Sequence, residues 1–467
     1  MCHFGTCDLT LDKRVLLTHV CHCWQPSKLI LPVWLCYERH RKASVFAPFL
    51  RSLPSKLDLP LMWKPAELTV LNSSWVYSAV QDDLAMMRET FKTTMSRLCQ
   101  LYPGAEQAGG FGADACKVAT WKWAWAILWS RSVVVEVPAP RIIQQNHQAS
   151  ESSSGVASAH ALVPLADMAN HVPSAHANAL SFWDSEKLQW VMEATLPIRA
   201  GEEILLSYGD ELGNAHLLQR YGFVLPTAVP AADISTVQLP LGAAAHERGS
   251  AVGRARRALS RALFDATADI ESLDLLSPQT AEGRQAYQML LLYAVVRVVD
   301  DPAQHIDGFA EGADIAYRLQ SELARDRMLR LRALAYMQEL LAGWLNFADD
   351  STDTVGADAV DWFKSGLQDG HIASGALQFC DASNSPVAMY NCRPRLSSAA
   401  AAAVSARNLP SKAQKAMEKE AVVAYREWCG RTVVAGEREV LQAVLDYAQL
   451  ESQQLQRRSV KEIEKEL

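Results

Sequence analysis

The spacing of hydrophobic residues predicts helices in the first part of the chain. Apolar side chains recur every three or four positions from Leu84 to Leu98, which predicts a helix over residues 82–102. Residues 29–53 show a similar pattern and predict an earlier helix, followed by proline-rich turns.

The most aromatic stretch covers residues 119–135. Trp121, Trp125 and Trp129 stand four residues apart in it, so they would share one face of a helix. Because tryptophan side chains contribute large apolar surfaces to protein cores, we expect this face to be buried.

Further along, the pattern changes from helical to strand-like. Residues 144–160 are polar and of low complexity, which predicts a surface loop. After it, short apolar runs separated by turn residues predict strands at residues 180–183, 188–194 and 203–208.

Helical patterns dominate from about Ala258 onward. Residues 315–347 are too long for one average helix and predict two. A loop or short helix over residues 397–412 precedes what we expect to be a final pair of charged helices. The whole pattern predicts a mixed α/β part followed by a helical part, with a boundary between residues 225 and 240.

Composition and charge narrow the class of protein. A chain of 467 residues is expected to form two or three domains. Its net charge of −7 argues against general nucleic-acid binding, which usually requires a basic surface. No apolar run reaches the roughly 18 residues of a membrane span, and residues 1–25 lack a secretory signal. We therefore expect neither a nucleic-acid partner nor a membrane partner.

The cysteines indicate an intracellular protein. Ten cysteines without a secretory signal predict reduced thiols rather than a disulfide framework, although cytoplasm, nucleus and plastid are not distinguished. Cysteines and histidines crowd the first 23 residues, but Cys21, His22 and Cys23 are too close together for tetrahedral zinc and no C-x-x-C pair occurs there. We favour an irregular N-terminal tail and expect no metal.

The stretch LVPLADMANHVPSAHANA, residues 162–179, carries the first candidate chemistry. It brings Asp167, Asn170, His171 and His176 within ten residues. Such residues form turn caps, metal sites or ligand pockets. A metal site from Asp167, His171 and His176 is disfavoured because no further ligand pattern supports it.

Five short motifs in order give this stretch a context. They are SRS (residues 130–132), LVPLADMANH (162–171), PIRAGEEILLSYG (197–209), N-x-x-L-L (214–218) and YGF (221–223). In this order the chain resembles a SET-domain methyltransferase, in the branch typified by Rubisco large-subunit methyltransferase. The resemblance covers residues 29–226 and is loose beyond them.

The resemblance implies an α+β fold with small SET-type β-sheets, a pseudoknot-like crossing, a helical insert and an all-α C-terminal domain. The SET domain would cover residues 29–230, with the insert at about 29–135 and the core at about 160–225. Residues 231–467 would form a helical domain similar to the family's substrate-binding domain. The Gly-rich turn of the family's first strands is not found, so residues 1–28 are expected to be an atypical N-terminal segment.

The implied activity is that of an S-adenosylmethionine-dependent protein-lysine N-methyltransferase with a protein substrate. Two alternatives stay open. The acceptor could be histidine, because fold-mates methylate either side chain. The missing Gly-rich turn also leaves room for a catalytically inactive SET-like protein that binds a partner.

Tyr208 is the catalytic candidate implied by the resemblance. In a strand, Ile204, Leu206 and Tyr208 would share one face. Since a phenol has a reference pKa of about 10, orienting the acceptor amine is a better role than removing its proton. A core tyrosine with a satisfied hydroxyl is the structural alternative.

The resemblance also implies the residues around the cofactor and the acceptor. Arg131 would hold the cofactor carboxylate, while Asn170, His171 and Asp167 would form the cofactor pocket. Arg131 could instead be a solvated charge, and Asp167 a turn cap. Tyr221 and Phe223 would line the acceptor channel, although core aromatics have the same sequence pattern.

Overall fold

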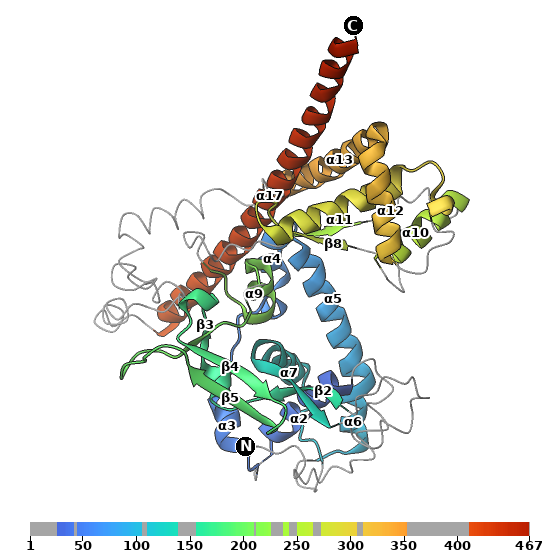
Figure 1. The fold of residues 1–467 in the computed structure, drawn as a ribbon. Helices are drawn as coiled ribbons and strands as arrows, with labels where there is room; N and C mark the ends of the chain where they lie inside the picture. The colour runs from blue at the N-terminus through green and yellow to red at the C-terminus, as the bar shows by residue number, and fades with distance from the viewer. Residues whose placement is uncertain are drawn as a thin grey trace.

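The fold combines a mixed part and a helical part that share one long C-terminal helix (Figure 1). The computed structural model describes residues 26–41, 44–104, 110–138, 156–209, 212–225, 237–241, 250–264, 272–305, 312–352 and 411–466.

Helices form most of the described chain before residue 132. They are α2 (Pro26–Arg39), α3 (Ala47–Ser52), η1 (Pro60–Met62), α4 (Pro65–Leu68), η2 (Thr69–Leu71), α5 (Trp75–Thr90), η3 (Phe91–Met95), α6 (Ser96–Leu101) and α7 (Val118–Arg131). The helix predicted over residues 82–102 is confirmed and joins α5 to α6 through the π-turn η3. The single helix predicted over residues 29–53 is wrong. Pro48 stands in the first turn of α3 and has no N–H with which to continue a preceding helix.

The tryptophan stripe lies on α7, as predicted. Trp121 and Trp125 are buried, and their rings meet edge to face with centroids 6.0 Å apart. Trp129 continues the stack at 5.5 Å from Trp125. The helix ends at Arg131, so the predicted helical stripe does not extend through residue 135. A strand begins instead where three β-branched valines follow one another.

The strands pair into two-stranded sheets within the described residues. β1 (Ser132–Pro138) is antiparallel to β2 (Val156–Leu162), and β4 (Ala179–Asp184) is antiparallel to β5 (Gln189–Ala194). β3 (Asn170–His171) is parallel to β6 (Leu205–Leu206). β7 (Val237–Pro240) is antiparallel to β8 (Ser272–Leu275) and belongs to the core of the helical part.

The sheets confirm two predicted strands and change two other predictions. The strands predicted at residues 180–183 and 188–194 are β4 and β5. The strand predicted over residues 203–208 is only the two-residue β6. The loop predicted over residues 144–160 is wrong at its end, because residues 156–160 pair with β1. Residues 144–155 lie outside the described residues.

The helical part contains α10 (Ala251–Leu263), α11 (Ala281–Val298), η7 (Pro302–His305), α12 (Gly312–Arg325), α13 (Arg327–Thr352) and α17 (Ser411–Glu466). The two helices predicted over residues 315–347 are confirmed as α12 and α13. The expected final pair of charged helices is wrong, because residues 411–466 form the single helix α17. No helix in the described ranges is long and apolar enough to cross a membrane.

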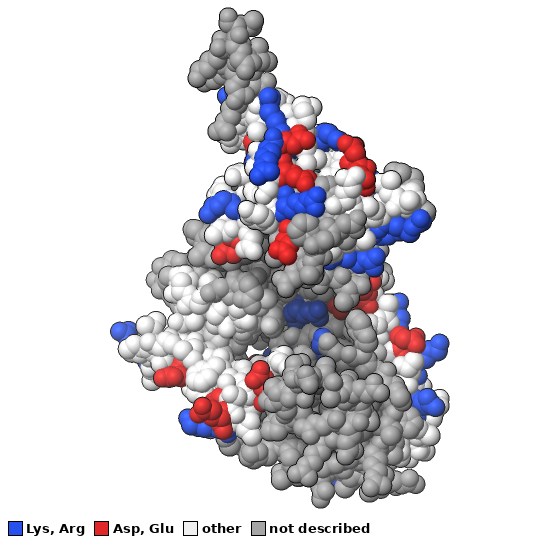
Figure 2. Space-filling model, turned by 45° about the vertical axis from the view of Figure 1, so that its right-hand side comes forward, with Lys and Arg blue, Asp and Glu red and all other residues white. Residues whose placement is uncertain are grey.

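Charges on the helical part are mixed. On the face drawn in Figure 2, the described acidic and basic side chains alternate over this part. Several pair with each other, such as Arg330 with Glu451 at 2.6 Å and Arg332 with Asp300 at 2.9 Å. An exposed pair such as Arg332 with Asp300 contributes little to stability, and the hydrophobic core around α11 and α13 holds this part together.

Helix α17 packs against both parts. Its first half contributes Tyr425, Cys429 and Val433 to a core shared with α5 and α9 (Asn214–Tyr221). Its second half packs against α11 and α13 in the helical part. The helix is also held by charge, because Arg426 bonds Asp58 at 2.7 Å and Glu67 at 2.6 Å.

The cysteines differ from the expectation of reduced thiols. Cys99 on α6 and Cys116, just before α7, form a disulfide. They lie 17 residues apart, and no spacing rule distinguishes such a pair from two free thiols. Cys36 and Cys429 are free and buried, and burial raises the pKa of both thiols.

Glu437 makes the stability of the contact between α17 and α5 depend on pH. Its buried carboxyl accepts a 2.7 Å hydrogen bond from Ser74, the residue that caps α5. Burial raises the pKa of Glu437 to about 8, well above the value of about 4.3 for an unfolded glutamate. The stabilising contribution is therefore complete below about pH 4 and is lost as the pH rises through about 8.

We expect Glu437→Gln to remove this loss, because a neutral amide does not ionise. Urea denaturation at pH 6 and pH 9 should show a lower midpoint at pH 9 for the wild type and a smaller difference for the variant. Glu439→Gln, at an exposed position on the same helix, is the control. A wild-type midpoint that does not fall between the two pH values would contradict the assignment.

Candidate active site

The parallel pairing of β3 with β6 brings the two central candidate segments together. Asn170 stands opposite Leu205 and His171 opposite Leu206. The Val172 N–H extends the pairing with a 2.9 Å bond to the Leu206 carbonyl. Tyr208, two residues beyond β6, consequently lies beside residues 169–171.

Tyr208 is fixed by its backbone and its hydroxyl. Its N–H donates to His171 Nδ1 at 3.0 Å, and its hydroxyl donates to the Ala169 carbonyl at 2.7 Å. The strand alternation proposed for this segment is wrong, because Leu205 and Leu206 are both buried while Ile204 is 45% exposed. The turn after β6, rather than a strand face, therefore orients Tyr208.

His171 is buried and acts as an acceptor. Because its Nδ1 accepts the Tyr208 N–H, a neutral ring carries its proton on Nε2. Its ring lies 5.1 Å from that of Tyr208 and 6.1 Å from that of Phe223. The side chain thus connects β3 to the residues that follow both β6 and α9.

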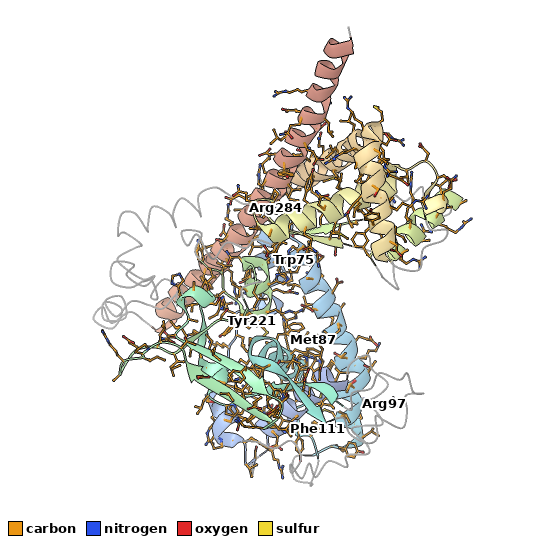
Figure 3. The ribbon with its side chains drawn as sticks, in the orientation of Figure 1. Trp75, Met87, Arg97, Phe111, Tyr221 and Arg284 are labelled. Atoms are coloured by element: carbon orange, nitrogen blue, oxygen red, sulfur yellow. A yellow bond between two sulfur atoms is a disulfide. The ribbon has the colours of Figure 1, made fainter. Side chains whose placement is uncertain are left out.

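Four rings from three segments form an aromatic cluster, consisting of His171, Tyr208, Tyr221 and Phe223. Tyr221 ends α9, and its ring lies 4.8 Å from that of Tyr208 and 6.2 Å from that of Phe223. Figure 3 shows Tyr221 at the end of α9 that faces the sheets. The structure therefore brings the proposed catalytic tyrosine together with both proposed channel residues.

Arg131 and Asp167 form a second, adjoining group. Arg131 Nη1 donates to the Asp167 carbonyl at 2.7 Å and lies 3.4 Å from its carboxylate. Burial raises the pKa of the Asp167 carboxyl, and the Arg131 guanidinium counteracts part of this rise. Leu165, two residues earlier, adopts a left-handed φ of 74°, so the turn that delivers Asp167 is strained.

Two polar atoms of this group have no hydrogen-bond partner. Arg131 Nε and Asp167 Oδ1 are both buried and unsatisfied. Leaving a buried polar group unbonded costs about 1–3 kcal/mol. Such a donor and acceptor, on two residues that bond each other, are suited to a ligand that carries both an anionic and a cationic group.

The sequence analysis did not identify two further polar residues near the site, Glu203 and Asn178. Asn170 Nδ2 donates to a carboxylate oxygen of Glu203. Asn178 bonds the backbone on both sides of Ile204, donating to the Glu203 carbonyl at 2.8 Å and accepting from Leu205 N at 2.9 Å. These contacts hold β6 in place. The Glu203 and Asn178 side chains follow no periodic pattern, so only the fold reveals their partners.

His176 follows β3 by five residues. It ends the short turn η5 (Ser174–His176). Within the described ranges, no three histidine, cysteine, aspartate or glutamate side chains are grouped as metal ligands. The cysteines and histidines of the first 23 residues lie outside these ranges.

Known proteins with similar sequences are methyltransferases. No family model matches the chain. The chain is 25% identical over 215 residues to ribosomal lysine N-methyltransferase 1 of Saccharomyces cerevisiae, covering 42% of this chain and 35% of the relative. It is 26% identical over 199 residues to human actin-histidine N-methyltransferase, covering 42% of this chain and 30% of the relative. The chain thus spans about a third of the length of these relatives.

Similarity among solved structures extends over nearly the whole chain. Rubisco LSMT bound to AdoMet matches with a TM-score of 0.52 and 17% identity, covering 96% of this chain and 81% of that one. The chain has the SET-domain fold. The SET domain of LSMT bound to lysine and AdoHcy matches with a TM-score of 0.51 and 18% identity, over 94% of this chain and 78% of that one. The predicted α+β class and its SET-type architecture are thereby confirmed, whereas the expectation of an all-α C-terminal part is wrong, because that part contains β7 and β8.

Gly222 allows the chain to place Tyr221 and Phe223 on either side of a tight turn. It has a left-handed φ of 79°, and an added Cβ would lie 2.6 Å from the Asp58 carbonyl oxygen. We expect Gly222→Ala to destabilise the protein by more than the 1–2 kcal/mol or so that left-handed strain alone costs.

Gly201→Ala provides a matched control, because Gly201 has a φ of 89° but no heavy atom within 4 Å of its added Cβ. Chemical denaturation of both variants measures the difference. Equal losses of stability would show that the contact with Asp58 is not limiting.

Proposed function

We propose that this SET-domain chain is an S-adenosylmethionine-dependent protein N-methyltransferase that acts on lysine. The observation that carries the proposal is the Tyr208 hydroxyl, held on the Ala169 carbonyl inside the aromatic cluster. The buried Arg131 and Asp167 pair lies next to it in sequence and space, since Ala169 follows Asp167 by two residues.

The polar groups of the site fit the amino-acid portion of S-adenosylmethionine. The unsatisfied Arg131 N–H suits a carboxylate, and the unsatisfied Asp167 oxygen suits an ammonium group. The Asn170 side chain can donate and accept at once. These three residues would hold the cofactor, with His171 supporting the same strand.

S-adenosylmethionine, when bound, supplies a methyl group on a sulfonium that accepts the electron pair of the breaking carbon–sulfur bond. The residues of the chain then need only align a neutral acceptor amine and exclude water. No general base is required in contact with the amine, because the lysine ammonium can lose its proton to solvent before the neutral amine meets the methyl group.

Tyr208 would orient the amine. Its hydroxyl proton points to the Ala169 carbonyl, so the lone pairs of the oxygen can accept a hydrogen bond from an amine N–H. Tyr221 and Phe223 would contact the acceptor side chain and stabilise the methylammonium product through cation–π attraction.

Lysine is the preferred acceptor, although the relatives include both types. A yeast relative is named a ribosomal lysine methyltransferase, and the human relative an actin-histidine methyltransferase. The structural neighbour with bound lysine supports lysine, since its likeness extends over most of the chain. Histidine remains the second candidate.

Tyr208→Phe tests the proposed catalytic role. We expect methyl transfer to fall at least about 100-fold, since the hydrogen bond that orients the amine is lost. The Kd for S-adenosylmethionine, measured by isothermal titration, should stay within about twofold of wild type. An equal loss of cofactor affinity would show that Tyr208 belongs to the cofactor pocket instead.

Arg131→Met tests the cofactor site separately. Because a hydrogen bond to a charged group contributes about 1.5–3 kcal/mol, the Kd for S-adenosylmethionine should rise about 10- to 100-fold. Arg97→Met, at an exposed position on α6, should leave the Kd unchanged. Unaltered binding in the Arg131 variant would remove that residue from the pocket.

The acceptor is identified by labelling. Tritiated S-adenosylmethionine is incubated with the protein and a cell extract, and the labelled protein is hydrolysed to amino acids. Recovery of Nε-methyllysine supports the proposal, whereas methylhistidine would replace lysine by histidine. If the wild-type protein does not bind S-adenosylmethionine at millimolar concentration, the proposed methyltransferase activity is excluded and a partner-binding role is favoured.

A further inference from the structure

Asp83, on α5, lies outside the site but contacts the helix that carries Tyr221. Its carboxylate accepts a 3.0 Å hydrogen bond from Gln219 Nε2 and lies 3.9 Å from Arg220 Nη1. Gln219 and Arg220 are the two residues immediately before Tyr221. The Asp83 carboxylate therefore contacts two adjacent residues in the last turn of α9.

The hydrogen bond of this contact is protected from solvent, because only 16% of the Asp83 side chain is exposed and Gln219 is buried. Interactions in such surroundings are screened less than those on the surface. The Arg220 side chain is 38% exposed, so the hydrogen bond from Gln219 is the stronger of the two contacts. Burial raises the pKa of the Asp83 carboxyl, while Arg220 and the Gln219 hydrogen bond counteract the rise.

Arg220 extends this contact to α7. Its guanidinium carbon lies 4.9 Å from the ring centre of Trp129, which precedes Arg131 by two residues. Arg220 thus bridges Asp83 of α5 and the tryptophan stripe of α7. The end of α9 is tied to both helices next to the site.

A separate contact holds the other end of α9. His216 lies against Trp75 at the start of α5, with ring centroids 4.9 Å apart. Figure 3 shows Trp75 near α9, far along α5 from Met87. Losing Asp83 would therefore remove a polar contact from the end of α9 that carries Tyr221 while leaving the contact at its start in place.

We propose that Asp83 is a positioning residue that fixes the aromatic wall of Tyr221 and Phe223 and thereby sets affinity for the acceptor side chain. This inference rests on the proposed function. It assigns Asp83 to acceptor binding rather than to cofactor binding, because the residues it bonds, Gln219 and Arg220, directly precede Tyr221 of the aromatic cluster.

The position of Tyr221 is measured without any ligand. Protein labelled with 3-fluorotyrosine gives fluorine resonances that Tyr221→Phe and Tyr287→Phe variants assign. We expect Asp83→Ala to shift the Tyr221 resonance and to leave that of Tyr287, in the core of the helical part, unchanged. Asp82→Ala, its exposed neighbour, should move neither.

Affinity is measured with free L-lysine as the probe, titrated into protein saturated with S-adenosylhomocysteine. Asp83→Ala should raise the Kd for L-lysine about tenfold, while the Kd for S-adenosylmethionine stays within about twofold. Asp83→Asn keeps an oxygen for Gln219 and should recover most of the L-lysine affinity. Gln219→Met removes the same hydrogen bond from the other side and stands in if Asp83→Ala does not fold.

Two results would overturn the inference. One is an unchanged Tyr221 resonance, or one that moves only together with Tyr287. The other is an equal loss of affinity for S-adenosylmethionine and L-lysine. A wild-type protein that binds S-adenosylhomocysteine but not L-lysine contradicts the lysine acceptor of the proposed function, and the Tyr221 resonance still decides the role of Asp83.

Discussion

The pairing of two residues of β3 with two residues of β6 is the contact on which the candidate site depends. So short a ladder supplies few hydrogen bonds of its own, and side chains complete it. Asn178 fixes the backbone on both sides of Ile204, and His171 accepts the Tyr208 N–H beyond the end of β6. The contacts of the Tyr208 ring with His171 and Tyr221 follow from this pairing, because the turn after β6 brings the ring close to both.

Sequence patterns predicted the features that depend on neighbouring residues. The tryptophan stripe of α7 follows from helical periodicity and the division into α12 and α13 from the length of the helical pattern, and the structure contains both. The ordered motifs selected the segments of the candidate site. Features that depend on distant partners were missed. β2 becomes a strand because β1 supplies its hydrogen bonds, and two cores bury the middle of α17, from Tyr425 to Ala448.

Polar contacts of charged side chains fix the positions of the helices around the site. Apolar packing tolerates sliding between helices, whereas a buried carboxylate must meet its donor within about 3 Å. Asp83 fixes the end of α9, and Arg426 fixes α17 against Asp58 and Glu67. Asp83 and Arg426 belong to none of the ordered motifs. Sequence reasoning could therefore select Tyr221 and Phe223 but not the residues that hold the surrounding helices.

The continuity of α17 also limits how the molecule can move. At 1.5 Å per residue, its 56 residues span about 84 Å, and both parts pack on the same helix. A hinge between the parts would have to bend an intact helix or separate Arg426 from its two carboxylates. The two parts are therefore joined by one stiff helix, and any opening between them requires α17 to bend.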